Sequence, residues 1–335
     1  MGVRGTALAR AVSRRLARPG GWRAPVLALT LLWCVSRALV LFPGETLRDR
    51  TLYRLTILRD PGDVIIVRDG ASVPDSEFSD ADKRSISGVF RWVATNTTRC
   101  GRQASFGGQV YANRKWETRL LEGDRPVCLD PEFSIGDAGT PCVVYSFGIN
   151  RDWSFDDAMA RFGCEVHSFD PSIGAQPARR PSGVYFHPVG LGRNDHVNVY
   201  GWQIWTLDRA MRELGHDHLP RLQYLKLDGE GAEWDMFSQQ LLDGVGHRAL
   251  DKFDQIGLEV HMRKSAEREM EFYHRAANVT QRLSEIGWQV ADTAPNKIYP
   301  VWFRFPGVSE PVSHMYDLLL LNRRERRNPT VRAGS

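Results

Sequence analysis

Strand and helix signals alternate along residues 141–322, and this alternation limits the chain to few architectures. Amphipathic segments with helical spacing separate most of the apolar runs, notably at 204–214 and 264–286. The runs that predict strands are seven in number: 142–147, 164–169, 183–191, 222–227, 253–260, 288–293 and 314–322. Such alternation is typical of a parallel sheet covered on both faces. We therefore predict an α/β fold with a doubly wound, mainly parallel seven-stranded sheet over 141–322.

The rest of the chain divides by composition. Residues 43–78 form a stem punctuated by proline and glycine, with one apolar run at Val64–Val67. Residues 79–140 are predicted to be an N-terminal extension, a helix followed by a loop-like stretch at 101–139. Residues 323–335 contain RRERR and are predicted to be a basic, solvated tail.

The N-terminus predicts a membrane anchor. Residues 1–23 hold six arginines and no acid, and the apolar residues 24–42 follow. Nineteen residues in a helix reach about 28 Å, close to the hydrocarbon thickness of a bilayer. Arg37 is near the far end of this span, where snorkelling reduces its cost. A single-pass type II anchor with a cytoplasmic basic tail is our prediction, and a cleaved signal peptide or a mitochondrial presequence are the alternatives.

Charge argues against one class of partner. The chain carries +4 net, but the arginine tail alone contributes +6, which leaves −2 for all that follows. A slightly acidic globule lacks the electrostatic footprint of nucleic-acid binding. No nucleic-acid partner is expected.

Cysteines and glycosylation sequons favour the secretory pathway. The four cysteines after the anchor permit two disulfides in three pairings, and none has the CxxC spacing of a zinc site. They are Cys100, Cys128, Cys142 and Cys164. Sequons begin at Asn96 and Asn278. We expect a domain in the lumen of the Golgi or the endoplasmic reticulum, with secretion as the alternative.

Residues that directly follow the strands are the candidate site, because ligands bind at the carboxyl ends of strands in doubly wound sheets. Gly148 follows the first strand and permits close backbone approach. Asp170 lies 22 residues further on, near the spacing at which an acid binds ribose hydroxyls. Glu259 and His261 follow on one face of the fifth strand.

The fourth strand ends in a cluster of acids within LQYLKLDGEGAEWDMF, residues 222–237. Asp228 is at the strand tip and is predicted to face the ligands, with Glu230 beside it. Glu233 and Asp235 fall in the first turn of the next helix, where acids favour the helix dipole. They are predicted to be helix-start acids without a chemical role.

Three stretches resemble a known family: VVYSFGINRDWSFDDAM, FGCEVHSFDPS and YLKLDGEGAEW. Together they are similar to the methyltransferase-like protein 24 family, which is related to the FkbM-type class I methyltransferases. The resemblance covers about residues 80–322 and implies a Rossmann-like fold and S-adenosylmethionine as cofactor. It implies that the donor is bound by Phe147, Gly148, Asn150, Asp170, Pro171 and Asp228. Among these, Asp170 would hold the ribose and Asp228 would lie beside the sulfonium and the substrate.

The implied reaction is methyl transfer to a hydroxyl or amine of an unknown acceptor. Such a transfer needs alignment and a base, and we predict His261 as the base and Asp228 as its catalytic partner. Glu230 and Glu259 are candidate substrate or metal ligands, since carboxylate oxygens suit Mg²⁺ and Ca²⁺. No resident metal is assigned.

Two other functions stay open. Because the glycine-rich loop is reduced to Gly148, the chain could be a catalytically inactive binding or scaffold protein. The triplet Asp80-Ala81-Asp82 resembles the DxD of a Golgi glycosyltransferase, although it reads as a helix start. His216-Asp217-His218 offers two metal ligands with no third in reach, which predicts a polar loop.

Overall fold

The computed structural model describes most of the chain from residue 54 onward. The described residues are 54–57, 64–113, 118–133, 135, 141–244, 248–296, 299 and 301–324. The predicted basic tail 1–23 and anchor 24–42 lie outside them, as does 325–335. No helix in these described ranges is both long enough and apolar enough to cross a bilayer.

An eight-stranded sheet organises the fold, in the order β16-β19-β15-β14-β7-β8-β10-β9. Its strands are β7 (Val143–Phe147), β8 (Glu165–Phe169), β9 (Ala178–Arg179), β10 (Tyr185–His187), β14 (Leu222–Leu227), β15 (Phe253–His261), β16 (Trp288–Pro295) and β19 (Met315–Asn322). Neighbours from β10 to β15 pair in parallel, whereas β19 is antiparallel to both β15 and β16. Every predicted strand contributes. The predicted count of seven becomes eight because the short β9 adds an antiparallel edge to β10.

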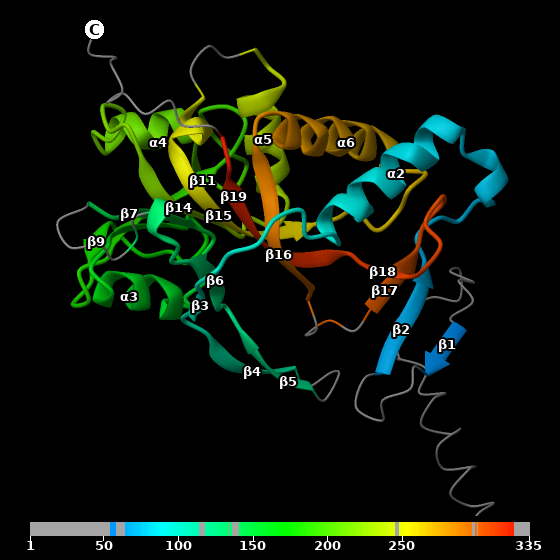
Figure 1. The fold of residues 1–335 in the computed structure, drawn as a ribbon, viewed down its shortest axis with the longest axis horizontal. Coiled ribbons are helices and arrows are strands. Elements are labelled where there is room, and N and C mark those ends of the chain that lie inside the picture. The colour runs from blue at the N-terminus through cyan, green and yellow to red at the C-terminus, as the bar shows by residue number, and fades with distance from the viewer. Residues whose placement is uncertain are drawn as a thin grey trace, which may run out of the picture. The chain divides into compact units, whose positions relative to one another are not determined.

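Helices and strands cover both faces of this sheet (Figure 1). One face packs on α2 (Asp80–Val93), α4 (Leu207–Glu213), α5 (Ala232–Leu241) and α6 (Met270–Glu285). The other face packs on α3 (Ser154–Arg161) and β6 (Arg125–Cys128). Alternation along β7 explains this arrangement, since Tyr145 and Phe147 belong to the first core and Val144 to the second. The fold is therefore a doubly covered α/β sheet.

The extension is more ordered than expected. Residues 101–139, predicted to be loop-like, contain β3 (Gln103–Phe106), β4 (Gln109–Asn113), β5 (Thr118–Glu122) and β6. β3 pairs with β6, and β4 with β5, as antiparallel ladders. The side-chain amide of Gln255 accepts from the backbone N–H of Cys128 and donates to its carbonyl, each at 2.8 Å. This clamp fixes β6 on the main sheet.

Folded structure also begins before residue 79. Within the predicted stem, β1 (Arg54–Ile57) and β2 (Val64–Asp69) join β17 (Val301–Arg304) and β18 (Val312–Ser313) in a small sheet. Val67 and Phe78 are buried. The predicted helix start at Ser79 is confirmed, because Ser79 and Asp82 form a capping box at the first turn of α2.

The remaining elements are short. The predicted strand 183–191 is divided between β10 and β11 (Val189–Leu191), which pairs with β13 (Gln203–Trp205) and not with the main sheet. β12 (His196–Val197) completes that three-stranded sheet. Single 3-10 turns are η1 (Asp75–Glu77), η2 (Pro131–Phe133) and η3 (Ala249–Lys252).

The four cysteines form two disulfides. Cys100 pairs with Cys128, and Cys142 with Cys164. The first lies within the extension and joins the segment after α2 to the end of β6, and the second joins the residues that precede β7 and β8. The structure thus selects one of the three pairings that the sequence left open.

Candidate functional site

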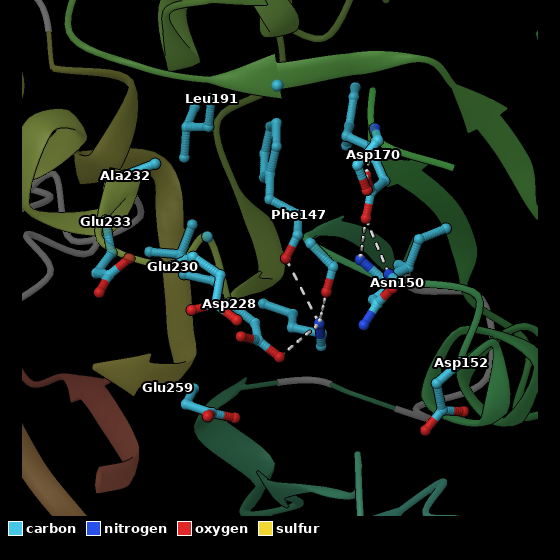
Figure 2. A pocket seen from close by; sticks show the side chains of 18 of the residues that line it. Phe147, Asn150, Asp152, Asp170, Leu191, Asp228, Glu230, Ala232, Glu233 and Glu259 are labelled. Carbon is cyan, nitrogen blue, oxygen red and sulfur yellow. Dashed lines mark hydrogen bonds and ion pairs between the residues drawn. The ribbon is translucent and has the colours of Figure 1, made fainter. Parts of the chain in front are cut away.

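A cavity of about 880 Å³ opens where β7, β8 and β14 end. Its lining includes the predicted donor-binding and substrate-binding residues: Phe147, Gly148, Asn150, Asp170, Pro171, Asp228, Glu230 and Glu259. Figure 2 shows Asp228, Glu230 and Glu259 gathered on one side of the cavity, with Asp170 directed at Asn150. Chain segments far apart in sequence meet here because parallel strands bring their carboxyl ends to one edge.

Gly148 allows β7 and β14 to converge at this edge. Its φ is +76°, and a Cβ placed there would lie 1.7 Å from the carbonyl oxygen of Asp228. On either side, the Gly148 N–H donates to the carbonyl of Phe169, and the Asp228 N–H to that of Phe147. The sequence predicted close backbone approach at Gly148, and in the structure the backbone of Asp228 is what approaches.

Asp170 holds the loop that follows β7. One carboxylate oxygen accepts from the backbone N–H groups of Ile149 and Asn150, at 3.1 and 2.9 Å. The other accepts from the N–H and the hydroxyl of Ser172, at 2.8 and 2.6 Å. These four donors match the acceptor capacity of a carboxylate. A ribose hydroxyl would have to replace one of them, and the predicted ribose role of Asp170 stays a prediction.

Backbone strain concentrates around the cavity. Asn150, Arg151 and Glu230 adopt positive φ values of 38°, 67° and 54°, and all three line it. Such conformations cost of order 1–3 kcal/mol each and persist where surrounding contacts enforce them. For Asn150 that contact is the hydrogen bond to Asp170. Strain of this kind clusters at ligand-binding sites.

Arg125 lies beneath the acidic wall of the cavity, the side formed by Asp228, Glu230 and Glu259. It is absent from the predicted site. It comes from β6, its side chain is 2% exposed, and Nη2 contacts Asp228 at 2.9 Å and Glu259 at 2.8 Å. Nη1 lies 3.2 Å from Asp317. Lys226 is also close, with Nζ 3.7 Å from Asp228 and donating to the carbonyl of Gly148 at 2.6 Å. Two buried cations therefore hold Asp228 at the tip of β14.

The acids around Arg125 retain protons at unusually high pH. Burial, with the charge of Glu259 next, raises the pKa of Glu122 to about 7. Burial raises the pKa of Asp317 to about 8 against the opposing charge of Arg125, and it raises the pKa of Glu259 as well. The positive charge of one guanidinium is not enough to keep every neighbouring carboxylate ionised in a poorly solvated site. At neutral pH the group is therefore partly protonated, and Glu122, which lines the cavity, is near its midpoint.

His261 is adjacent to the cavity and outside its described lining. Nε2 lies 3.5 Å from Glu230 and 3.6 Å from Glu259, and Nδ1 lies 3.3 Å from Glu233. Burial favours the neutral ring, but the hydrogen bond to Glu233 and the nearby negative charges raise its pKa to about 9. His261 is then a cation at neutral pH. Its role as a base stays a prediction, and this pKa does not favour it.

Glu233 has a contact that the sequence did not indicate. It falls in the first turn of α5, as predicted, but it is buried and accepts hydrogen bonds from the N–H groups of Gly231 and His261. Trp234 donates from its indole to the carbonyl of His261 at 3.0 Å. The helix-start acid is thus also the residue that positions His261.

A cation could use part of this donor set. Asp228, Glu259 and His261 each offer one ligand atom, all within 4.8 Å of one another. The guanidinium of Arg125 already contacts one oxygen of each of the two carboxylates and supplies positive charge there. The side chain of Glu230 is 87% exposed. Metal binding by Glu230 and Glu259 stays a prediction.

Two other predicted features lie away from the cavity. Asp82 of the DxD-like triplet accepts from Ser79 and lies 2.9 Å from His274, which is the geometry of a helix N-terminus. Asn96 and Asn278 are both exposed. Glycosylation of these asparagines stays a prediction.

Comparison with known proteins identifies the domain. A family model described as a methyltransferase domain matches residues 112–295, more than half of the chain. The chain belongs to this methyltransferase family. It is 30% identical over 144 residues to the probable methyltransferase-like protein 24 of Homo sapiens, which is 41% of this chain and 37% of that protein. The corresponding protein of Rattus norvegicus gives 30% over 144 residues, or 41% and 38%.

The match covers little more than a third of the length of these curated relatives. The predicted resemblance to the methyltransferase-like protein 24 family is confirmed, and with it a Rossmann-like class I fold. The region that matches the methyltransferase domain includes β5 and β6. The strands that carry Glu122 and Arg125 thus lie within the matched region.

Proposed function

We propose that this chain transfers a methyl group from S-adenosylmethionine to a hydroxyl or amine of an acceptor in the secretory pathway. The observation that carries the proposal is the acid-walled cavity at the ends of β7, β8 and β14 of a methyltransferase domain. Its volume of about 880 Å³ is within the usual range for small-molecule and cofactor sites.

The chain's own residues supply the features that this chemistry needs. When bound, S-adenosylmethionine supplies an electrophilic methyl group on a sulfonium cation. Asp228 is suited to face that charge, because the contacts of Arg125 and Lys226 with Asp228 are both to Oδ2. Its Oδ1 can therefore point into the cavity. Ordered strand ends can fix the direction from which the acceptor approaches the methyl group, and this alignment is the main requirement of a methyl transfer.

A proton must leave the acceptor, and two groups compete for it. His261 is the base that the sequence indicates. Glu122 lines the cavity with a pKa near 7, which matches the proton affinity that a base needs at neutral pH. His261 would first have to lose a proton that it holds until about pH 9. Glu122 is therefore the stronger candidate for the base.

Disulfides and sequons support the cellular placement. Both cysteine pairs are formed, which suits an oxidising compartment, and both sequon asparagines are exposed. We therefore keep the proposed lumenal domain in the Golgi or endoplasmic reticulum, behind the anchor at 24–42. No nucleic-acid partner is proposed.

Photolabelling tests the proposal. The full chain is irradiated with S-adenosylmethionine that carries tritium on its methyl group, digested, and the labelled peptides are mapped. Label is expected on peptides that include 147–152, 170–172 or 226–231, and S-adenosylhomocysteine should abolish it. Label that survives this competitor would be nonspecific and would count against the proposal. No labelling would favour an inactive scaffold, and protection by a nucleotide sugar alone would favour a glycosyltransferase.

A further inference from the structure

A second polar cluster is located at the opposite end of the sheet from the cavity. Glu165 begins β8 and His167 lies two residues later on the same face, whereas Asp170 follows the end of that strand. His216 reaches them from the loop between α4 and β14. One ligand atom from each of Glu165, His167 and His216 lies within 4.8 Å of the others. The third metal ligand that the sequence did not offer His216 is thus supplied by β8.

The spacing of these atoms is close to that of a zinc site. Oε1 of Glu165 lies 2.8 Å from Nε2 of His167 and 3.3 Å from Nε2 of His216. Zinc bonds of about 2.0–2.1 Å in tetrahedral geometry separate neighbouring ligand atoms by about 3.4 Å. Oε1 of Glu165 and Nε2 of His216 already have about this separation. Oε1 of Glu165 and Nε2 of His167 would have to move apart by about 0.6 Å.

The other ring nitrogens are held as metal-binding histidines require. Nδ1 of His167 lies 3.0 Å from Nε2 of His187, and Nδ1 of His216 lies 2.8 Å from the hydroxyl of Tyr145. Each partner can accept a hydrogen bond from Nδ1–H, and this tautomer directs the Nε2 lone pair at the shared point. Such outer contacts orient histidine ligands in zinc sites.

Burial and access are also suitable. The side chain of His167 is 7% exposed and that of His216 is 11% exposed, whereas that of Glu165 is 47% exposed. An ion could enter along the Glu165 side and keep a water there.

We propose that Glu165, His167 and His216 bind one zinc ion, with water as a fourth ligand. The ion would tie the loop before β14 to the amino end of β8, next to the Cys142–Cys164 disulfide. The site lies at the strand end away from the cavity, so the ion would act apart from the methyl-transfer site. The proposal does not depend on the methyl donor.

Metal analysis of the full chain, prepared without a histidine tag, tests this site. After equilibration with Zn²⁺ and gel filtration, one zinc per chain should be retained, with Kd measured by competition with a chromophoric chelator. Glu165→Gln should weaken binding at least about 100-fold, and Tyr145→Phe about 10–100-fold. His196→Gln is the matched control, since His196 is exposed and its ring Nδ1 lies at hydrogen-bond distance from the Asn194 carbonyl, outside the Glu165 cluster.

Thermal unfolding provides a second readout that does not rely on a variant's yield. Zn²⁺ should raise the Tm of the wild type and of His196→Gln, and leave that of Glu165→Gln unchanged. Glu165 is half exposed, so its replacement by glutamine is compatible with folding. Equal zinc affinity and stoichiometry in wild type and Glu165→Gln would overturn the proposal and leave a metal-free hydrogen-bond network.

Discussion

Arg125 donates a hydrogen bond to Asp228 at 2.9 Å across 103 positions of sequence. The same guanidinium nitrogen contacts Glu259 at 2.8 Å. A residue of the N-terminal extension therefore fixes the position of the carboxylate expected to face the methyl donor. The extension is a structural part of the site, and removing it would leave buried acids without their main partner.

Arg125→Met should destabilise the fold strongly. The substitution leaves Glu259 buried without its cation, and breaking a buried ion pair from one side costs about 3–5 kcal/mol. The free energy of unfolding in urea measures the effect. Adding Glu259→Gln should recover part of the loss, because the unpaired charge is then removed.

Arg193→Ala is the matched control for Arg125. Arg193 pairs with Asp243 at the surface, and its loss should cost less than about 1 kcal/mol. Equal costs for the two arginine variants would show that Arg125 does not support the acidic cluster.

Gly148→Ala should disrupt the strand ends. The new Cβ would lie 1.7 Å from the carbonyl oxygen of Asp228, so β7 and β14 must separate. We expect a loss of at least about 4 kcal/mol in the free energy of unfolding, the range of severe core changes. Gly174 has a similar φ of +66° with nothing within 4 Å of the added Cβ. Gly174→Ala should cost only about 1–2 kcal/mol in the free energy of unfolding. Equal losses in Gly148→Ala and Gly174→Ala would refute the close approach of β7 and β14.

The imidazole of His261 should titrate near pH 9. The hydrogen bond to Glu233 contributes most to raising its pKa, so Glu233→Gln should move the midpoint toward 6.5. Histidine ring resonances in NMR spectra, assigned with a His261→Gln sample, give the midpoints directly. A wild-type midpoint near 6.5 would restore His261 as a base for neutral pH and weaken the case for Glu122.

The contribution of Asp317 to the free energy of unfolding should fall as pH rises from 5 to 8. Asp317 has a folded pKa of about 8 against an ordinary carboxyl value of 3.8, so the folded state binds its proton more tightly than the unfolded chain does. The resulting stabilisation is complete below about pH 4 and is lost as pH rises through 8, at no more than about 1.4 kcal/mol per pH unit. Asp317→Asn should flatten the decline measured by urea unfolding.

Asp243→Asn serves as the control for this pH dependence. The hydrogen bond from Arg193 lowers the pKa of Asp243, so its contribution is already complete at pH 5. The decline between pH 5 and 8 should be the same as in the wild type. Profiles of the same slope in the wild type and in Asp317→Asn between pH 5 and 8 would contradict the assignment to Asp317.

Local sequence patterns predicted the main sheet because its strands are buried on both faces. Runs such as Leu222–Leu227 are apolar enough to read as strands, and the strand ends locate Gly148, Asp170 and Asp228 on one edge. The predicted strand at 183–191 failed in one respect, since its second half pairs with β13. Pairing partners are a tertiary property that the apolar run does not encode.

The elements and residues that the sequence did not predict were missed for a physical reason. β3 alternates between exposed and half-buried residues over four positions, too short a pattern to separate from a loop. Arg125 and Glu122 belong to similarly short strands, and only the packing of β6 on Gln255 and Tyr224 shows where Arg125 points. The contact of Glu233 with His261 was not predicted, because the helix dipole alone is a sufficient local reason for an acid in a first helical turn.

Titration calorimetry with S-adenosylmethionine on the full chain tests whether the cavity binds the methyl donor. One donor should bind per chain, with binding at least about tenfold weaker in Asp228→Asn and unchanged in the surface variant Asp243→Asn. A cooperative unfolding transition in each sample confirms that the protein is folded. Folded wild type that gives no binding heat at millimolar S-adenosylmethionine, at two temperatures, would contradict the account.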